Sequence, residues 1–165
     1  MDAAYRKYQT NLLFSGLAIM AFGLWSAVKL IVYLTLHPEV ITNIVAVEAL
    51  EYSESKIKVF FFVFFGFFVF VSLMLHFFIG SSAVRDARRK TRLRIPYITV
   101  SVIYAFLLIT NGVHIFPTLA AEEGGGHLFT TIVIDATSLL ALAIIVVSSH
   151  KLNKIRKMQV TTAGD

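Results

Sequence analysis

Two charged residues, Lys29 and Asp135, lie well inside long apolar runs of the sequence. Lys29 lies eight positions before His37, and Asp135 lies eight positions after His127. At 1.5 Å per helical residue, each lies about 12 Å from the end of its own apolar run, and the two ends are expected on the same side of the membrane. A charge at that depth costs about 2 to 3 kcal/mol unless it is paired or hydrated. We therefore expect the two side chains to meet or share water, and such a pair can bind a small solute or relay a proton.

Polar side chains accompany these two charges at helical spacing. Thr131, Asp135 and Ser138 are separated by four and three positions, which places them on one face of a helix. The side chains that we expect to line an outward-facing cavity are Lys29, Asp135, Asn111, His114, Ser26, Thr131, Ser138 and Tyr104. The alternative is that Lys29 snorkels to the interface while the polar groups only tie helices together. The sequence leaves both interpretations open.

Soluble-type enzyme chemistry has no candidate residues in this sequence. The chain has no cysteine, which excludes disulfide exchange and thiolate metal sites. Its five histidines show no metal-ligand spacing, and His76 and His150 are offset too far along the membrane normal to share a haem. There is also no nucleophile elbow and no phosphate-binding loop followed by Lys and Ser or Thr. We predict a non-enzymatic protein without metal or cofactor, and the sequence leaves open an intramembrane enzyme that uses Asp135 and His114.

The elements that must position these residues are four apolar runs, at 11–36, 57–80, 95–117 and 128–150. Each is long enough as a helix to cross a hydrocarbon layer about 30 Å thick. The 165 residues leave no room for a soluble domain beside four spans. The sequence therefore predicts an all-α, left-handed four-helix membrane bundle that forms a single domain over 1–165.

The positions of the basic residues predict the orientation of this bundle. Of the 15 Lys and Arg residues, 12 fall in three patches, at 6–7, 85–94 and 151–157. The connections on the other side hold six glutamates. The positive-inside rule therefore places both termini and the 81–94 loop in the cytoplasm. We expect the plasma (inner) membrane of a bacterium.

The 81–94 loop is predicted to bind anionic lipid headgroups on the cytoplasmic face, because it carries six cations and one acid. The residues expected to make these contacts are Arg85, Arg88, Arg89, Lys90, Arg92 and Arg94. Lipid is a better match than nucleic acid for the net charge of +5, since the cations lie where helices leave the membrane.

Two further features concern the outer loop and the second span. Apolar residues between Glu39 and Leu50 recur at helical spacing, which favours a short amphipathic external helix over an ordinary ordered loop. Ten of the 15 phenylalanines lie between Phe60 and Phe78, on every face of the second span. This pattern predicts lipid contact and ring packing, with Gly66 allowing one close helix approach.

The leading functional hypothesis from the sequence is a small transport or channel protein with a cavity around Lys29 and Asp135. Four spans enclose little volume, so a conduction path would require a homo-oligomer. The alternative is a structural or accessory membrane subunit that docks on a partner protein or on anionic lipid.

Overall fold

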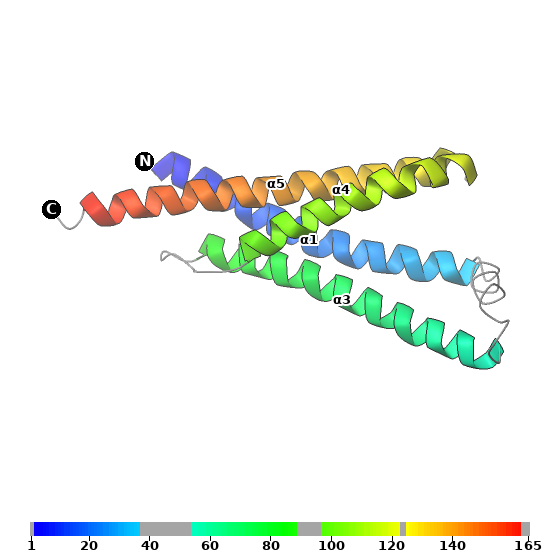
Figure 1. The fold of residues 1–165 in the computed structure, drawn as a ribbon. Helices are drawn as coiled ribbons and strands as arrows, with labels where there is room; N and C mark the ends of the chain where they lie inside the picture. The colour runs from blue at the N-terminus through cyan, green and yellow to red at the C-terminus, as the bar shows by residue number, and fades with distance from the viewer. Residues whose placement is uncertain (1, 37–53, 89–96, 123–124, 163–165) are drawn as a thin grey trace. The chain divides into compact units, whose positions relative to one another are not determined.

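The computed structural model describes four stretches of the chain, and each of them is an α-helix (Figure 1). They are α1 (Asp2–Leu36), α3 (Glu54–Arg88), α4 (Tyr97–Glu122) and α5 (Gly125–Thr162). Side chains are described over 3–35 in α1 except 33–34, from Val59 onward in α3 except 61, as far as Thr110 in α4, and over 132–159 and at Thr161 in α5. The all-α prediction is confirmed for this part of the chain. The proposed external helix at 39–50 lies outside the described residues.

Three of these helices are long and apolar enough to cross a membrane. The candidate spans are Ala3–Val32, Phe62–Arg88 and Ile132–Gln159, and α4 adds a shorter apolar stretch, Tyr97–Thr110. Windows of this length and composition are typical of membrane helices and indicate a membrane protein.

Three helices extend beyond the predicted apolar runs. Residues 81–88, predicted as part of a loop, continue α3 to Arg88, because Ala83 and Ala87 favour helix and are buried in the core. Helix α4 passes through Pro117 to Glu122, since a proline removes only one hydrogen bond of the helical ladder. Helix α5 runs 12 residues beyond the predicted end at 150, to Thr162.

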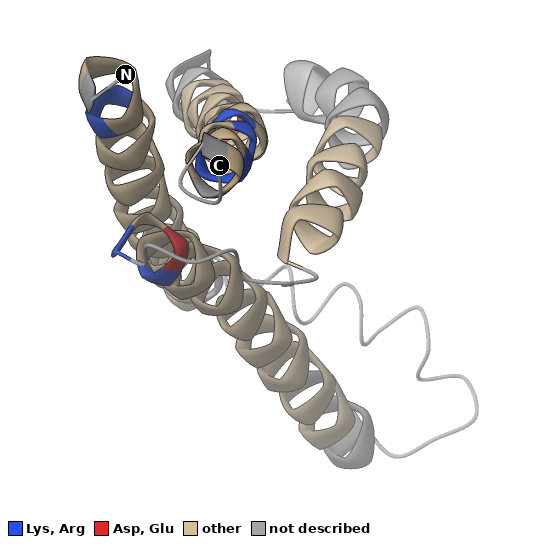
Figure 2. Ribbon diagram, turned by 90° about the vertical axis from the view of Figure 1, so that its left-hand side faces the viewer, with Lys and Arg blue, Asp and Glu red and all other residues tan. Residues whose placement is uncertain are grey.

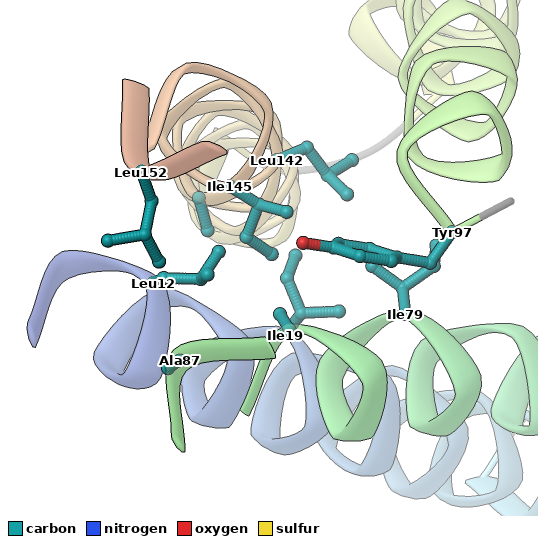
Figure 3. Close-up of a cluster of buried hydrophobic side chains, with 10 residues drawn as sticks. Leu12, Ile19, Ile79, Ala87, Tyr97, Leu142, Ile145 and Leu152 are labelled. Atoms are coloured by element: carbon teal, nitrogen blue, oxygen red, sulfur yellow. The ribbon is translucent and has the colours of Figure 1, made fainter. Parts of the chain in front are cut away.

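The chain divides into two compact units. The first unit comprises Met1–Phe22 and Phe77–Asp165, and the second comprises Gly23–His76. The core of the first unit receives side chains from all four helices (Figure 3). Its buried members are Leu12, Ile19, Ile79, Ala83, Ala87, Tyr97, Ala141, Leu142, Ile145 and Leu152. Lipid tails are as apolar as leucine, so in a bilayer this cluster is held by close packing more than by hydrophobic transfer.

Helix α5 presents one continuous inner face to this core, and α4 packs along it. Its buried positions recur every three or four residues, the spacing of a helix seam: Ser138, Ala141, Leu142, Ile145, Ser148, Ser149, Leu152, Ile155 and Arg156. The repeat continues past residue 150 and therefore carries Ser149 and Arg156 to the inside of the unit.

Close helix contacts occur at glycines other than Gly66. A Cβ atom on Gly80 would lie 2.5 Å from the carbonyl oxygen of Gly16, so α1 and α3 meet backbone to backbone in the first unit. In the second unit, a Cβ atom on Gly23 would overlap the side chain of His76. Around Gly66 a Cβ atom would meet nothing within 4 Å among the described residues. Within the described residues of its own unit, no helix makes the predicted close approach at Gly66, because this glycine lies on an exposed face.

The phenylalanines of α3 are largely exposed in the chain on its own. Phe60, Phe64, Phe67 and Phe68 each expose between 60% and 70% of their surface. The rings of Phe60 and Phe64 stack on the helix surface, with centroids 6.1 Å apart. A helix face of this kind suits lipid contact and ring packing.

Candidate functional site

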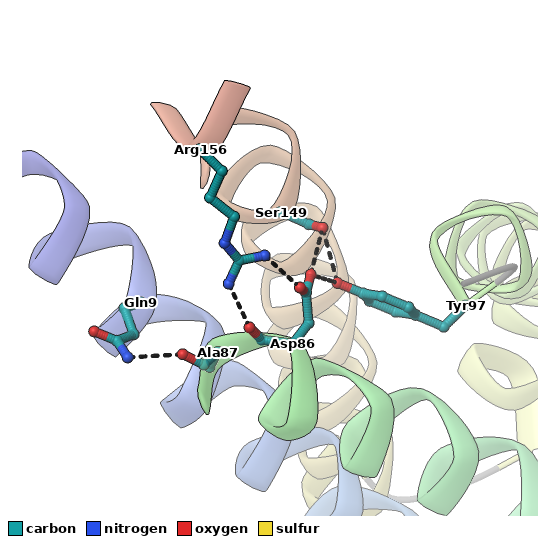
Figure 4. Close-up of polar contacts among 6 residues, drawn as sticks. All are labelled: Gln9, Asp86, Ala87, Tyr97, Ser149 and Arg156. Atoms are coloured by element: carbon teal, nitrogen blue, oxygen red, sulfur yellow. Dashed lines mark hydrogen bonds and ion pairs between the residues drawn. The ribbon is translucent and has the colours of Figure 1, made fainter. Parts of the chain in front are cut away.

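A buried ion pair joins α3 to α5 in the first unit (Figure 4). The Arg156 Nη1 atom lies 2.7 Å from Oδ1 of Asp86, and the two side chains are only 5% and 2% exposed. The helical phase of α3 places Asp86 inward, three positions after Ala83, while the seam of α5 places Arg156 opposite it. Burial of both charges together makes this the strongest candidate site in the described residues.

Two hydroxyl groups complete the surroundings of the Asp86 carboxylate. The Tyr97 hydroxyl donates to Asp86 Oδ2 over 2.7 Å, and the Ser149 hydroxyl reaches the same oxygen over 3.0 Å. The Tyr97 and Ser149 oxygens are 2.8 Å apart. Three oxygens therefore share two hydroxyl protons, and both carboxylate oxygens have donors. Residues from α3, α4 and α5 are joined in one hydrogen-bonded group.

The same group caps the C-terminal end of α3. The Arg156 Nη2 atom donates to the backbone carbonyl of Asp86 over 2.7 Å, and the Gln9 amide of α1 donates to the carbonyl of Ala87 over 2.7 Å. The last carbonyls of a helix have no partner within the helix and carry partial negative charge. Arg156 therefore compensates both the carboxylate and the helix end. We call Gln9, Asp86, Tyr97, Ser149 and Arg156 the clamp.

Electrostatics at this end of the unit are dominated by cations. Figure 2 shows Lys and Arg near the N-terminal end of the chain and along the C-terminal part of α5. The clamp brings the start of α1, the end of α3, the start of α4 and the C-terminal part of α5 together. Consecutive helices thus run in alternating directions through the first unit, as in an up-down-up-down bundle.

The contacts within the clamp suit a structural role, in which the side chains hold the helices together. Asp86 is a carboxylate whose two oxygens already accept hydrogen bonds from Arg156, Tyr97 and Ser149. A substrate would have to displace one of these donors from a buried position. Removing one partner of such a pair costs about 3 to 5 kcal/mol, because the other charge stays buried.

The residues of the predicted cavity are distributed over both units. Lys29 is half-buried in the second unit, and Asp135 is half-buried on α5 in the first. Their pairing stays a prediction. Ser138, one turn from Asp135, is buried, and Tyr104 packs against the core, whereas Ser26 is exposed. The remaining predicted residues lie outside those with described side chains: Asn111, His114 and Thr131.

The predicted lipid-binding residues are described only in part. Arg85 and Arg88 are exposed on the last turn of α3, with Arg85 reaching back to Ser81 and Ser82 at 3.4 Å. The others lie outside the described residues: Arg89, Lys90, Arg92 and Arg94.

The clamp itself was missed because its charges were assigned to cytoplasmic patches. Asp86 is the one acid among the six cations of 81–94, and Arg156 is one of four cations between 151 and 157. The available signal was helical phase. Arg156 continues the spacing of Ile145, Ser149 and Leu152, so extending the apolar repeat past residue 150 would have placed it inside. Tyr97 and Ser101 of α4 are both buried.

Comparisons with known proteins assign no family to the chain. No protein-family model, curated protein or solved structure matches the chain. The described residues also contain no group of three or more His, Asp or Glu side chains placed to hold a metal ion.

Proposed function

We propose that the protein is a structural or accessory membrane subunit in which the clamp holds the four helices together in the first unit. The observation that carries this proposal is the clamp: the buried Asp86 carboxylate is bonded directly to Arg156, Tyr97 and Ser149. Conducting pathways place ionisable groups toward water or a solute. In the clamp, the ionisable groups of Asp86 and Arg156 bind one another, which favours a role in holding helices together.

The proposed orientation places both termini in the cytoplasm and the clamp at the cytoplasmic ends of the spans, with the plasma membrane of a bacterium as the location. Its support is the distribution of basic residues and the alternating direction of the four helices in the first unit. Arg85 and Arg88, exposed at the end of α3, would then lie at the level of anionic headgroups.

Transport is a second candidate, and Asp135 is the observation that favours it. This carboxylate is half-buried within the candidate span Ile132–Gln159, one turn from the buried Ser138. A short acidic side chain at such a depth reaches the interface less readily than a lysine does. Transport through Asp135 and Lys29 would also require a homo-oligomer, because one four-helix chain encloses little volume.

Proton flux into liposomes tests the two proposals against each other. The purified chain is reconstituted in liposomes containing a pH-sensitive dye, as wild type, Asp135→Asn and the exposed-site control Thr137→Ala. The structural proposal predicts that all three match protein-free liposomes. Flux in the wild type and the control that Asp135→Asn abolishes would instead establish the transport function.

A further inference from the structure

A groove of about 580 Å³ lies between the first turn of α4 and the C-terminal part of α5. Its volume is within the usual range for small-ligand sites. The lining has an apolar part, formed by Ile98, Val146 and Val147. It also has a polar part, formed by His150, Lys151, Asn153, Lys154 and Lys157. The groove lies wholly within the first unit and is separate from the clamp.

The two parts follow one another along α5. Val146, His150 and Lys154 recur every four residues and therefore form one stripe of the helix. From Val146 to Lys157 the helix rises about 16 Å, and the side chains change from apolar to basic in that direction. This region also forms the end of the candidate span Ile132–Gln159. A ligand that fits it is apolar at one end and anionic at the other.

The charged side chains among the described residues that line the groove are all basic. Lys151, Lys154 and Lys157 are exposed, and no acidic residue is among the described residues that line the groove. Three ammonium groups spaced over two helical turns suit a phosphate group, which accepts several charge-assisted hydrogen bonds. The long lysine stems can also follow the apolar wall while their charged ends meet the phosphate.

One buried polar atom in the groove points independently to a ligand. Within the described part of the chain, the Oδ1 atom of Asn153 is buried and has no hydrogen-bond partner. Buried amide oxygens in folded proteins are almost always bonded. A rotation of the Asn153 amide toward the groove would let a headgroup hydroxyl supply the donor that this oxygen lacks.

We propose that this groove binds one molecule of an anionic phospholipid with a hydroxyl-bearing headgroup, of the phosphatidylglycerol type. Lys151, Lys154 and Lys157 hold its phosphate, Asn153 accepts from its headgroup, and Val146 and Val147 contact its acyl chain. This site is discrete and differs from the general attraction of exposed arginines for a charged surface. Lipid binding at this site is an additional property beside the proposed structural role, and it is equally compatible with transport.

Native mass spectrometry of the full chain, released from detergent micelles, tests the site directly. The probes are dioleoyl-phosphatidylglycerol, dioleoyl-phosphatidylcholine and soluble glycerol phosphate. The groove variant is Lys151→Gln/Lys154→Gln/Lys157→Gln. The matched control, Arg6→Gln/Lys7→Gln/Arg88→Gln, also removes three exposed cations at this end of the unit. A third variant replaces the three groove lysines by arginine and so keeps their charge.

The expected result is one retained phosphatidylglycerol in the wild type, the control and the arginine variant. The groove variant should bind it about tenfold or more weakly, at the level of phosphatidylcholine. Equal weakening in the groove variant and the control would overturn the proposal, because it would indicate diffuse attraction. Glycerol phosphate that binds as tightly as the lipid would also overturn it, because the apolar wall would then contribute nothing.

Discussion

At the scale of single residues, the pair formed by Asp86 and Arg156 determines how firmly the first unit is held. Both charged side chains are buried away from water. Each is tolerated in that position because Arg156 Nη1 lies 2.7 Å from Asp86 Oδ1. Replacing both by apolar residues removes the desolvation cost together with the attraction, whereas replacing one leaves a buried charge. Single and double substitutions should therefore differ strongly in their effect on the free energy of unfolding.

Asp86→Ala should lower the free energy of unfolding by about 3 to 5 kcal/mol, because Arg156 is left buried without its carboxylate. The double variant Asp86→Leu/Arg156→Leu should recover more than half of this loss. Unfolding in mixed micelles of increasing SDS content, followed by circular dichroism, measures both. Tyr97→Phe removes one hydrogen bond to a charged group and should cost less, about 1.5 to 3 kcal/mol.

Arg88→Ala is the matched control for this series, because Arg88 lies on the same turn of α3 and is exposed. Its effect should stay within about 0.5 kcal/mol. If Asp86→Ala proves as mild as Arg88→Ala, the ion pair contributes little and the clamp is not what fastens α3 to α5.

At the scale of helices, glycine positions decide where α1 and α3 approach closely. Gly80 faces the backbone of Gly16, while Gly66 faces open space on the same helix. The two glycines share a helical environment and differ only in what lies opposite. They therefore form an internal comparison between a crossing point and a free face.

Gly80→Ala should destabilise the protein by about 1 to 3 kcal/mol, because its new Cβ atom would press on the carbonyl of Gly16 at 2.5 Å. Gly66→Ala should be neutral or stabilising by up to about 1 kcal/mol, since alanine favours helix. The same SDS titration compares them. A Gly66→Ala variant that loses as much stability as Gly80→Ala would contradict this assignment of the crossing.

Helix content was predictable from the sequence because it depends on long apolar runs, whereas the sidedness inferred from the cations stays a prediction. The clamp was not predicted, since a charged residue near a helix end looks the same whether it meets solvent or a partner. Gly66 illustrates the same limit: a glycine in a span is typical of a crossing, but only the opposing helix determines whether one exists.

At the scale of the whole molecule, the proposed structural role requires the interior of the first unit beside Asp135 to be packed and dry. Ser138 tests this claim well, because it is 5% exposed on the inner face of α5, one turn from Asp135. The chain has no cysteine, so a single introduced thiol is the only one that a maleimide can label.

The most direct measurement is labelling of Ser138→Cys in liposomes by a charged, membrane-impermeant maleimide added to both sides. Thr161→Cys, at an exposed position of α5 outside the groove, serves as the positive control, and each variant is labelled again after denaturation in SDS. The structural proposal predicts no labelling at position 138 until SDS is added and rapid labelling at position 161 throughout. Labelling of the folded protein at position 138 as fast as at 161 would contradict the proposal and would establish a water-filled path to the membrane interior.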